Sequence, residues 1–387
     1  MKQAFSLYIH IPFCKHRCAY CDFNTYAGLE ETIPAYISAL CEEIRMVGTS
    51  GSTPNIRTIF FGGGTPSLVE INLYENIFEQ IYKYFNFEKN IEISLEANPG
   101  TVTLQYLQEL KQIGFNRVSF GVQSAHPEEL RLLERIHSYA EAVEAFKWAR
   151  MAGFANINFD LIYGLPGQTL ERWSDTLKLV TDLKPEHLSA YSLTIEPGTL
   201  FWRWAKKGLL PVPDQDLAAA EYEHAMGFLA EHGYMQYEIS NWALPKYECQ
   251  HNLQYWRNQP YLGFGAGAHG YANGYRYSNV LRIKTYIERM KTEMTGNFPL
   301  SSAVVNHQLN SKKDDMQETM ITGLRLTEEG ISRSGFEERF GIKLEEFYKK
   351  EIRQSIDAGL LEWVGDVLRL TVRGRLLGNQ VFMQFVD

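Results

Sequence analysis

The chain has 387 residues, of which 45% are hydrophobic and 22% are charged, as is typical of a globular protein. This length predicts two or three domains, or one large barrel with an appendage. The formal net charge of −8 argues against a nucleic-acid partner, because nucleic-acid surfaces need clustered Lys and Arg. We find neither a secretory signal sequence nor 18 consecutive apolar residues, so we expect a cytoplasmic protein whose cysteines stay reduced.

Short β-branched or aromatic runs alternate with helical patterns through the first half of the chain. Six strands are predicted, at 7–11, 56–61, 91–96, 118–122, 157–162 and 188–193. The helical patterns between them include 34–47, 104–113 and 170–183. This alternation predicts an α/β fold with a parallel sheet and right-handed crossovers. The number of strands alone leaves two alternatives, an open doubly wound sheet and a barrel.

Three of the five cysteines stand close together after the first predicted strand, as Cys14, Cys18 and Cys21. Thiolates are soft ligands that suit iron–sulfur clusters and zinc. A closed structural zinc site needs four protein ligands, and no second Cys/His pair follows at zinc-finger spacing. The pattern therefore favours a cluster held by three thiolates, with one iron open to a small molecule. The alternative is a zinc site that adds His10 or His16 to these cysteines.

Glycines and polar residues follow the carboxyl ends of several predicted strands. The run Gly-Gly-Gly-Thr-Pro-Ser at 62–67 follows the second strand, and Glu96, Gln123 and Asp160 lie at or just beyond the ends of later strands. In a parallel sheet or barrel these ends form the ligand-binding edge. The glycine run lacks the Gly-Lys-Ser/Thr of a phosphate loop, so a nucleoside triphosphate fits poorly. By itself the run is equally consistent with a tight turn between a strand and a helix.

The strand–helix alternation stops after residue 199. A helix at 216–231 leads into a region rich in Gly, Tyr and Trp at 233–279. Helices at 316–324, 333–340 and 344–358, followed by a hairpin at 360–370, look like a winged helix. The second of these helices is acidic at its centre, so we interpret the module as a packing unit rather than a DNA reader. The expected domains are 1–235, 236–312 and 313–387.

Taken together, these motifs resemble the radical S-adenosylmethionine (radical SAM) superfamily. The resemblance rests on CxxxCxxC with Tyr20 before the third cysteine, followed by a glycine-rich strand end. Segments 8–14, 62–67, 96–99, 121–123 and 160–166 further resemble the oxygen-independent coproporphyrinogen oxidase group. The resemblance implies a partial (β/α)6 barrel with a C-terminal winged-helix-like α+β domain. It also implies one [4Fe–4S] cluster on Cys14, Cys18 and Cys21, with S-adenosylmethionine chelating the fourth iron.

The resemblance assigns S-adenosylmethionine contacts residue by residue. It implies that a tyrosine lies against the adenine or the cluster, that the glycine run meets the methionine amino group, and that an arginine faces the carboxylate. Acidic and amide side chains at strand ends would accept hydrogen bonds from the amino group and the ribose hydroxyls. The residues expected to bind S-adenosylmethionine are Tyr8, Tyr20, Gly63, Gly64, Thr65, Glu96, Gln123, Arg135 and Asp160.

Two departures separate the chain from the oxidase itself. Phe23 stands where the oxidase typically has a further cysteine, and only seven residues precede Tyr8. Segment 251–256 has the pattern HNxxYW, which resembles the signature of the HemW family of heme chaperones. A neutral imidazole is a natural axial ligand for heme iron, so His251 is the expected heme ligand. The alternative is a structural loop in which this histidine bonds a backbone carbonyl; Cys249 and His269 are weaker ligand candidates.

The resemblance therefore implies a heme chaperone that binds heme and transfers it to hemoproteins, with respiratory membrane proteins as the expected acceptors. The alternative is an oxygen-independent coproporphyrinogen III oxidase, or another radical enzyme that acts on a porphyrin. Whether S-adenosylmethionine is cleaved during heme transfer is left open by the sequence. The family also implies a possible homodimer, and a peripheral place at the membrane through a partner.

Overall fold

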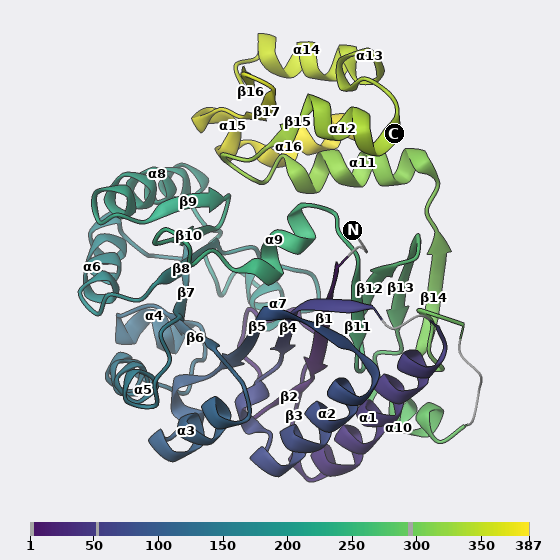
Figure 1. Ribbon diagram of the computed structural model, residues 1–387. Helices are drawn as coiled ribbons and strands as arrows, with labels where there is room; N and C mark the ends of the chain where they lie inside the picture. Colours follow the sequence, from purple (N-terminus) through teal and green to yellow (C-terminus); the bar gives the residue numbers. More distant parts are fainter. Residues whose placement is uncertain (1–3, 52–53, 293–296, 387) are drawn as a thin grey trace.

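The main sheet of this computed structural model has twelve strands, and it is built around six parallel ones (Figure 1). The structure describes residues 4–51, 54–292 and 297–386. The parallel strands are β1 (Ala4–Ile11), β4 (Asn55–Gly63), β5 (Asn86–Ala97), β6 (Arg117–Gln123), β7 (Ile157–Tyr163) and β8 (His187–Ser192). They lie side by side in that order, with parallel pairing throughout. The predicted six-stranded core of a partial barrel is confirmed.

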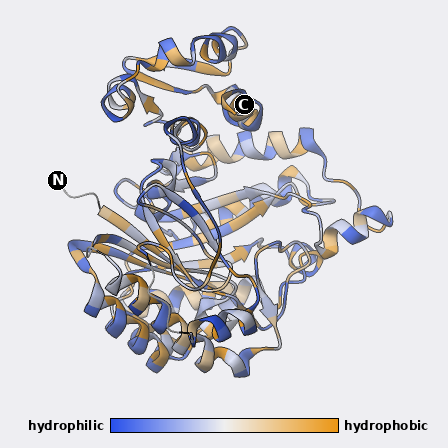
Figure 2. Cartoon of the chain, turned by 90° about the vertical axis from the view of Figure 1, so that its right-hand side faces the viewer, coloured by the Kyte–Doolittle hydropathy of each residue, from blue (hydrophilic) through white to orange (hydrophobic). Residues whose placement is uncertain are grey.

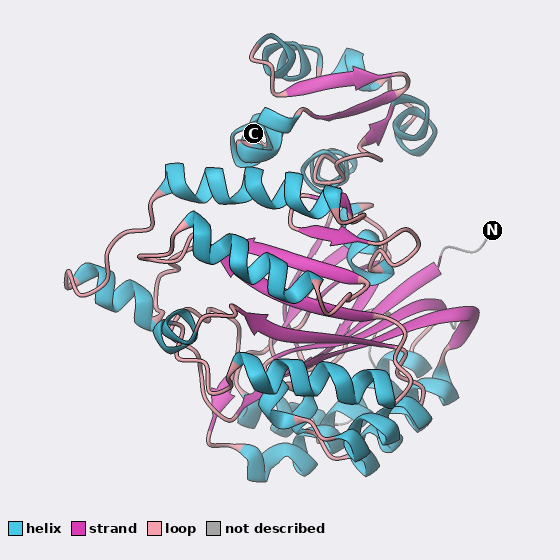
Figure 3. Cartoon of the chain, turned by 90° about the vertical axis from the view of Figure 1, so that its left-hand side faces the viewer, coloured by secondary structure: helices cyan, strands magenta, loops and turns pink. Residues whose placement is uncertain are grey.

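Helices connect these strands and cover the outer face of the sheet (Figure 3). The connecting helices are α1 (Ile33–Thr49), α2 (Ile71–Tyr84), α3 (Leu104–Gln112), α4 (Pro127–Leu132), α5 (Tyr139–Met151) and α6 (Leu170–Thr181); α7 (Leu200–Lys206) and α8 (Gln215–Glu231) follow β8. Apolar and polar residues alternate along them in Figure 2, as expected for amphipathic helices. On β4, for example, the Phe61 ring packs edge-on against Tyr74 of α2, with ring centroids 5.2 Å apart.

The region between the barrel and the C-terminal domain extends the sheet at both of its edges. At one edge, β10 (Asn241–Ala243) pairs antiparallel with β8 and with β9 (Met235–Glu238). At the other edge, β11 (Tyr261–Phe264) pairs parallel with β1, and an antiparallel meander follows. The meander contains β12 (His269–Ala272), β13 (Tyr275–Asn279), α10 (Ile283–Met290) and β14 (Val304–Leu309). The expected boundaries at 235 and 312 stay a prediction, because most of this region shares the barrel's sheet.

The C-terminal domain has its own apolar core and lies over one end of the barrel (Figure 1). It contains α11 (Lys312–Gly323), α12 (Arg333–Phe340), and a three-stranded sheet of β15 (Ile331–Ser332), β16 (Leu361–Val364) and β17 (Val367–Leu370). Ion pairs tie it to the barrel, including Arg276–Glu318 at 2.6 Å and Arg257–Glu329 at 2.7 Å. The winged-helix-like arrangement is confirmed.

Two details of this domain differ from the sequence prediction. The helix expected at 344–358 is broken into α13 (Leu344–Phe347) and α14 (Lys349–Asp357). Tyr348 between them leaves helical geometry (φ −105°, ψ 33°), and its buried ring packs against Phe336 and Phe385. Beyond the predicted hairpin, the chain continues into α15 (Val372–Leu376) and α16 (Gly378–Phe382). In the described ranges, no helix is both long enough and apolar enough to cross a membrane.

A buried carboxylate links α1 to the meander at the edge of the sheet. Glu43 is 1% exposed and accepts four hydrogen bonds, from Gly265 N at 2.8 Å, Asn279 Nδ2 at 2.8 Å, Tyr286 OH at 2.7 Å and Ser301 Oγ at 2.7 Å. Burial raises the pKa of Glu43 above its usual range. Because four donors from the meander converge on one side chain, the meander's position depends on it.

Replacing Glu43 by Ala is expected to destabilise the protein strongly. The change removes the acceptor of the buried Gly265 N–H and Tyr286 hydroxyl, and each buried donor left unpaired costs about 1–3 kcal/mol. Asn279 keeps its hydrogen bond to Gly265 O, and Ser301 is only partly buried. We expect the free energy of unfolding, measured by denaturant titration, to fall by at least about 3 kcal/mol. Glu42→Ala is the matched control, because Glu42 is half-buried and forms an ion pair with Arg45 of its own helix. A half-exposed pair of this kind is worth about 1 kcal/mol or less. Equal losses for the two variants would contradict this role of Glu43.

Candidate functional site

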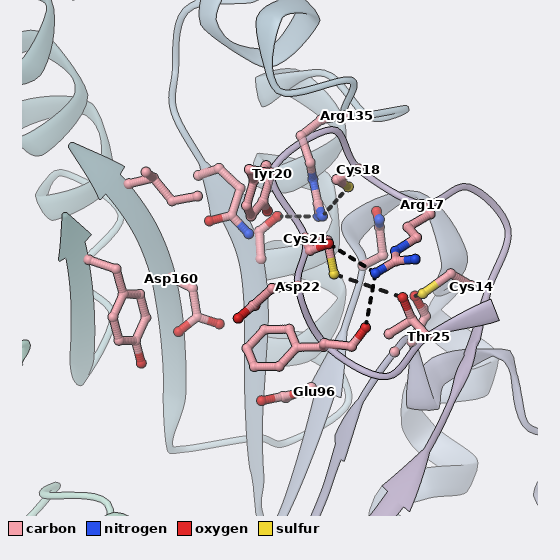
Figure 4. Close-up of a pocket in the computed structure, with 18 of the residues that line it drawn as sticks. Cys14, Arg17, Cys18, Tyr20, Cys21, Asp22, Thr25, Glu96, Arg135 and Asp160 are labelled. Atoms are coloured by element: carbon pink, nitrogen blue, oxygen red, sulfur yellow. Dashed lines mark hydrogen bonds between the residues drawn. The ribbon is translucent and has the colours of Figure 1, made fainter. Parts of the chain in front are cut away.

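A cavity of about 410 Å³ lies where the six parallel strands end (Figure 4). The loop that carries Cys14, Cys18 and Cys21, which we call the cysteine loop, folds over these strand ends. The lining of the cavity contains the three cysteines and eight of the nine residues that the sequence assigned to S-adenosylmethionine. These eight are Tyr20, Gly63, Gly64, Thr65, Glu96, Gln123, Arg135 and Asp160. The ninth, Tyr8, lies deeper along β1 and lines two neighbouring cavities instead. The fold thus brings the cysteines and these eight residues together at the predicted ligand-binding edge of the sheet. Their roles in binding stay predictions.

The glycine run positions the cysteine loop by direct backbone contact. The Gly64 N–H donates to Ile11 O at 2.8 Å, and the Thr65 N–H donates to Phe13 O at 2.7 Å. A Cβ on Gly64 would lie only 2.6 Å from Phe13 O. Gly63 has a φ of 112°, and its Cβ would lie 2.5 Å from His10 Nδ1. At Gly64 a side chain would clash with the backbone that enters the cysteine loop, and at Gly63 it would meet the His10 ring in a left-handed conformation that favours glycine.

Each of the three thiols has a polar neighbour within reach of its sulfur. Thr65 Oγ1 donates to Cys14 Sγ at 3.6 Å, and Arg135 Nη1 donates to Cys18 Sγ at 3.4 Å. The Cys21 sulfur lies 3.8 Å from the Thr25 hydroxyl. Hydrogen bonds of this kind stabilise thiolates and tune iron–sulfur centres.

The spread of the thiols also bears on the kind of metal that they suit. Among the residues that the structure describes, no three His, Cys, Asp or Glu side chains gather around one point as a single metal ion requires. A cubane instead binds each thiolate to a different iron, so it needs separated sulfurs. Burial raises the pKa of Cys14 to about 11 and also raises that of Cys21, so ligation would release their protons. Three thiols are the protein ligand set of a cluster with one open iron, whereas a closed structural zinc site needs four protein ligands.

Arg135 is held against the cysteine loop with part of its guanidinium unused. Its Nη2 donates to Gly121 O at 2.8 Å while Nη1 contacts Cys18. Its Nε is buried and has no hydrogen-bond partner within the described ranges. The preceding Glu134 has a φ of 54°, and Gln123 has a φ of 68°, both in the sparsely populated left-handed region. This arrangement leaves a buried donor for a ligand carboxylate.

Two acidic side chains line the cavity from strands on either side of β6, Glu96 from β5 and Asp160 from β7. Glu96 accepts a hydrogen bond from Gly63 N at 3.0 Å, and Asp160 accepts one from Ser119 Oγ at 2.7 Å and one from Asn158 Nδ2 at 2.8 Å. Burial, followed by the nearby Asp160 charge, raises the pKa of Glu96 to about 7. The pair can accept hydrogen bonds from amino or hydroxyl groups and balance a cationic ligand.

His251 lies deeper, inside the barrel, rather than on a surface loop. It belongs to α9 (Gln250–Trp256), is 1% exposed, and lines an inner cavity of about 180 Å³ together with Glu96 and Asp160. Its Nδ1 lies 2.8 Å from Thr58 Oγ1, and its Nε2 lies 2.9 Å from the Tyr255 hydroxyl. Burial lowers the pKa of His251 to about 3, so the ring is neutral. Both ring nitrogens therefore already have side-chain partners.

The other weak ligand candidates differ from each other in exposure. Cys249 is fully buried and donates to Glu92 Oε1 at 3.6 Å, whereas His269 is exposed at the start of β12. The sequence reasoning missed Arg17 and Thr25, which line the cavity beside the cysteines. Their proximity to the CxxxCxxC motif was the available signal, because residues between and just after clustered ligands must surround the same site.

Comparison with known proteins agrees with this geometry. Residues 8–180 match the family model of the radical SAM superfamily, and residues 310–377 match that of the HemN C-terminal domain. The heme chaperone HemW of Bacillus subtilis is 38% identical, covering 98% of this chain and 99% of its own length. The chain belongs to the heme chaperone HemW family. The HemW of Escherichia coli K12 is 36% identical, with 98% of both chains covered.

A solved structure also matches the HemW family chain along most of its length. Coproporphyrinogen III oxidase (HemN) from Escherichia coli, described as a radical SAM enzyme, superposes with a TM-score of 0.85. The two chains are 25% identical, and the match covers 99% of this chain and 90% of that one. Membership of the radical SAM superfamily implies a [4Fe–4S] cluster and S-adenosylmethionine. The residues in the cavity fit both groups, with three thiols, a buried arginine donor and two carboxylates.

The elevated pKa of Glu96 predicts a pH-dependent affinity for S-adenosylmethionine. The ionised carboxylate is the better acceptor and counter-charge, so affinity should fall as the pH drops from 8 to 6 and Glu96 takes up a proton. Glu96→Gln should lower affinity at pH 8 about tenfold or more, because hydrogen bonds to charged groups contribute about 1.5–3 kcal/mol. The variant should also lose most of the pH dependence. Anaerobic calorimetric titration of cluster-loaded protein measures both effects.

Glu88→Gln is the matched control, because Glu88 lies on the same strand, pairs with Arg57 and is absent from the cavity lining. It should bind S-adenosylmethionine as the wild type does at every pH. Parallel pH profiles for the wild type and Glu96→Gln would remove Glu96 from the binding site.

Proposed function

We propose that the protein binds heme and transfers it to hemoproteins, on a scaffold that carries a [4Fe–4S] cluster and S-adenosylmethionine. The observation that supports this most is the full-length likeness to relatives named heme chaperones. The HNxxYW pattern at 251–256 supports it as well, because this pattern resembles the signature of the HemW family.

Cys14, Cys18 and Cys21 are proposed to hold the cluster, which would supply electrons to S-adenosylmethionine when both are bound. The chain's own task is to orient that ligand. The free Nε of Arg135 would donate to the carboxylate, and Glu96 would accept from the amino group. The rings of Tyr8 and Tyr20 are also proposed to contact the ligand. The remaining proposed contacts come from the backbone of Gly63, Gly64 and Thr65 and from the polar groups of Gln123 and Asp160.

A radical oxidase acting on coproporphyrinogen is the second candidate, favoured by the structural likeness to HemN. Phe23 argues against it. Its side chain is 62% exposed and lines the cluster cavity at the position where the oxidase typically has a cysteine. We therefore propose that the site handles a finished heme and does not decarboxylate a porphyrinogen.

His251 is the residue that the motif nominates as the iron ligand. Ligation by Nε2 would require the imidazole to release the Tyr255 hydroxyl and to open the inner cavity toward a large macrocycle. That cavity, at about 180 Å³, lies below the range of about 300–1,000 Å³ typical of small-molecule sites. Ligation by His251 therefore depends on a rearrangement of α9.

The proposed partners follow from the same family inference. Acceptors would be hemoproteins, with respiratory membrane proteins as the main class. We propose that the protein works in the cytoplasm and reaches the membrane through a partner, since no basic amphipathic segment in its sequence supports direct lipid binding. A homodimer is part of the same proposal.

Heme transfer tests the proposed function. Anaerobically prepared, cluster-loaded protein is loaded with heme and mixed with an excess of an apo-hemoprotein, and the absorption spectrum of the acceptor is followed. We expect the acceptor to gain heme faster than it does from heme-loaded serum albumin, because a chaperone must release heme to a partner. In parallel, coproporphyrinogen III with reductant and S-adenosylmethionine should give no protoporphyrinogen IX. Failure to take up heme would overturn the chaperone proposal, and stoichiometric decarboxylation would establish the oxidase instead.

A further inference from the structure

A second cavity, of about 530 Å³, borders the cysteine loop. Its volume falls within the range of about 300–1,000 Å³ typical of small-molecule sites. It shares four lining residues with the cluster cavity, namely Arg17, Asp22, Phe23 and Thr25. We call segment 17–25 the shared wall, because these four of its residues line both cavities. A ligand in the second cavity would therefore lie beside the cluster site.

The second cavity offers flat aromatic surface and an apolar rim. Tyr8, Tyr26, Tyr255 and Tyr261 all line it. The rings of the last two cross at 85°, with centroids 4.6 Å apart, so they form a corner. At the rim, Phe23 is 62% exposed and Leu281 is 57% exposed. Exposed apolar groups beside a cavity mark a binding site for an apolar ligand, and aromatic walls suit a planar macrocycle.

His269 is the one histidine of this lining whose imidazole is unused. Within the described part of the chain, no hydrogen bond is found for its ring, and the residue is exposed. The other histidine of the lining, His10, is buried, and its two nitrogens lie 2.9 Å from the Tyr8 hydroxyl and 2.9 Å from Asn24 O. A metal ligand needs a free nitrogen lone pair, which His269 has and His10 lacks.

Close backbone packing fixes His269 next to the shared wall. Asn24 Nδ2 donates to Ala266 O and to Leu281 O, both at 3.0 Å, so the shared wall is tied to the turn before β12 and to the segment after β13. Gly267 has a φ of 83°, and a Cβ there would lie 2.5 Å from Asn24 Nδ2. The glycine lets this turn approach the shared wall closely, and β12 starts two residues later.

Charge at the cavity fits the acidic side chains of heme. Arg17 is exposed in the shared wall, and its Nη2 donates to Cys21 O at 3.2 Å and to Phe23 O at 3.4 Å. Among the described residues no other hydrogen bond of its guanidinium is found, so its remaining donors can pair with a propionate. Asp22 lines the same cavity, so it partly balances the positive charge of Arg17. We therefore expect one strong contact between the protein and a propionate rather than two.

We infer that heme binds in the second cavity with His269 as an axial ligand of its iron. His251 is then a positioning residue, because its Nε2 holds the hydroxyl of Tyr255, whose ring lines the cavity. This inference rests on the proposed heme-chaperone function, and it places the iron ligand 18 positions after the histidine that the motif nominates.

Absorption and electron paramagnetic resonance spectra of heme-loaded variants test the inference. His269→Ala should lose the spectral signature of histidine ligation and bind heme at least tenfold more weakly, and added imidazole should restore the signature. His251→Ala should keep that signature while heme affinity falls, and Tyr255→Phe should behave in the same way. His307→Ala is the control, because His307 is exposed on β14 and lies outside both cavities.

The outcomes separate this inference from the function on which it rests. Retention of the signature in His269→Ala overturns the inference, whether or not His251→Ala loses it, and leaves heme binding intact. Absence of heme uptake by the wild type overturns the proposed function itself. Circular dichroism of each variant establishes that it is folded, and imidazole rescue of His269→Ala distinguishes a lost ligand from a damaged cavity.

Discussion

The close contact between the glycine run and the chain entering the cysteine loop is the constraint on which the site depends. β1 and β4 pair in parallel with Ile11 opposite Gly63, so both strands end at the same level. Two backbone hydrogen bonds, from Gly64 and Thr65, then hold the first residues of the loop against the end of β4. Without Cβ atoms in the way, the three thiols come to lie over the strand ends, beside the polar groups that those ends carry.

Burial then sets the electrostatics of this edge. Burial, followed by the charge of Asp160 on the other side of β6, raises the pKa of Glu96, while Arg135 contributes a fixed positive charge next to Cys18. Such an arrangement is poised for a ligand that brings both an anionic and a cationic group. His251 belongs to the same buried interior and stays neutral, so it contributes hydrogen bonds to Thr58 and Tyr255 rather than charge.

The sequence predicted the parts of the molecule that depend on local pattern. Six strands, most of the helices and the convergence of strand-end residues followed from periodicity and from the geometry of parallel sheets. The pairing of β11 with β1 was not predictable, because it joins residues about 255 positions apart and leaves no local signal. The burial of His251 was also missed, since a motif names a residue type without saying whether its nitrogens are free. The break at Tyr348 depends on packing against Phe336 and Phe385, which is tertiary information.

The shared wall lines both cavities, and we propose that it contacts the cluster on one side and heme on the other. The most direct test is the rate at which heme leaves the protein for excess apomyoglobin, measured with cluster-loaded protein and with Cys18→Ser, which removes one of the three proposed cluster ligands. Cys41→Ser, which alters a cysteine outside both cavities, is the matched control. We expect heme to leave several-fold faster from Cys18→Ser, because a bound cluster would hold the shared wall in place. Equal rates for all three proteins would contradict it.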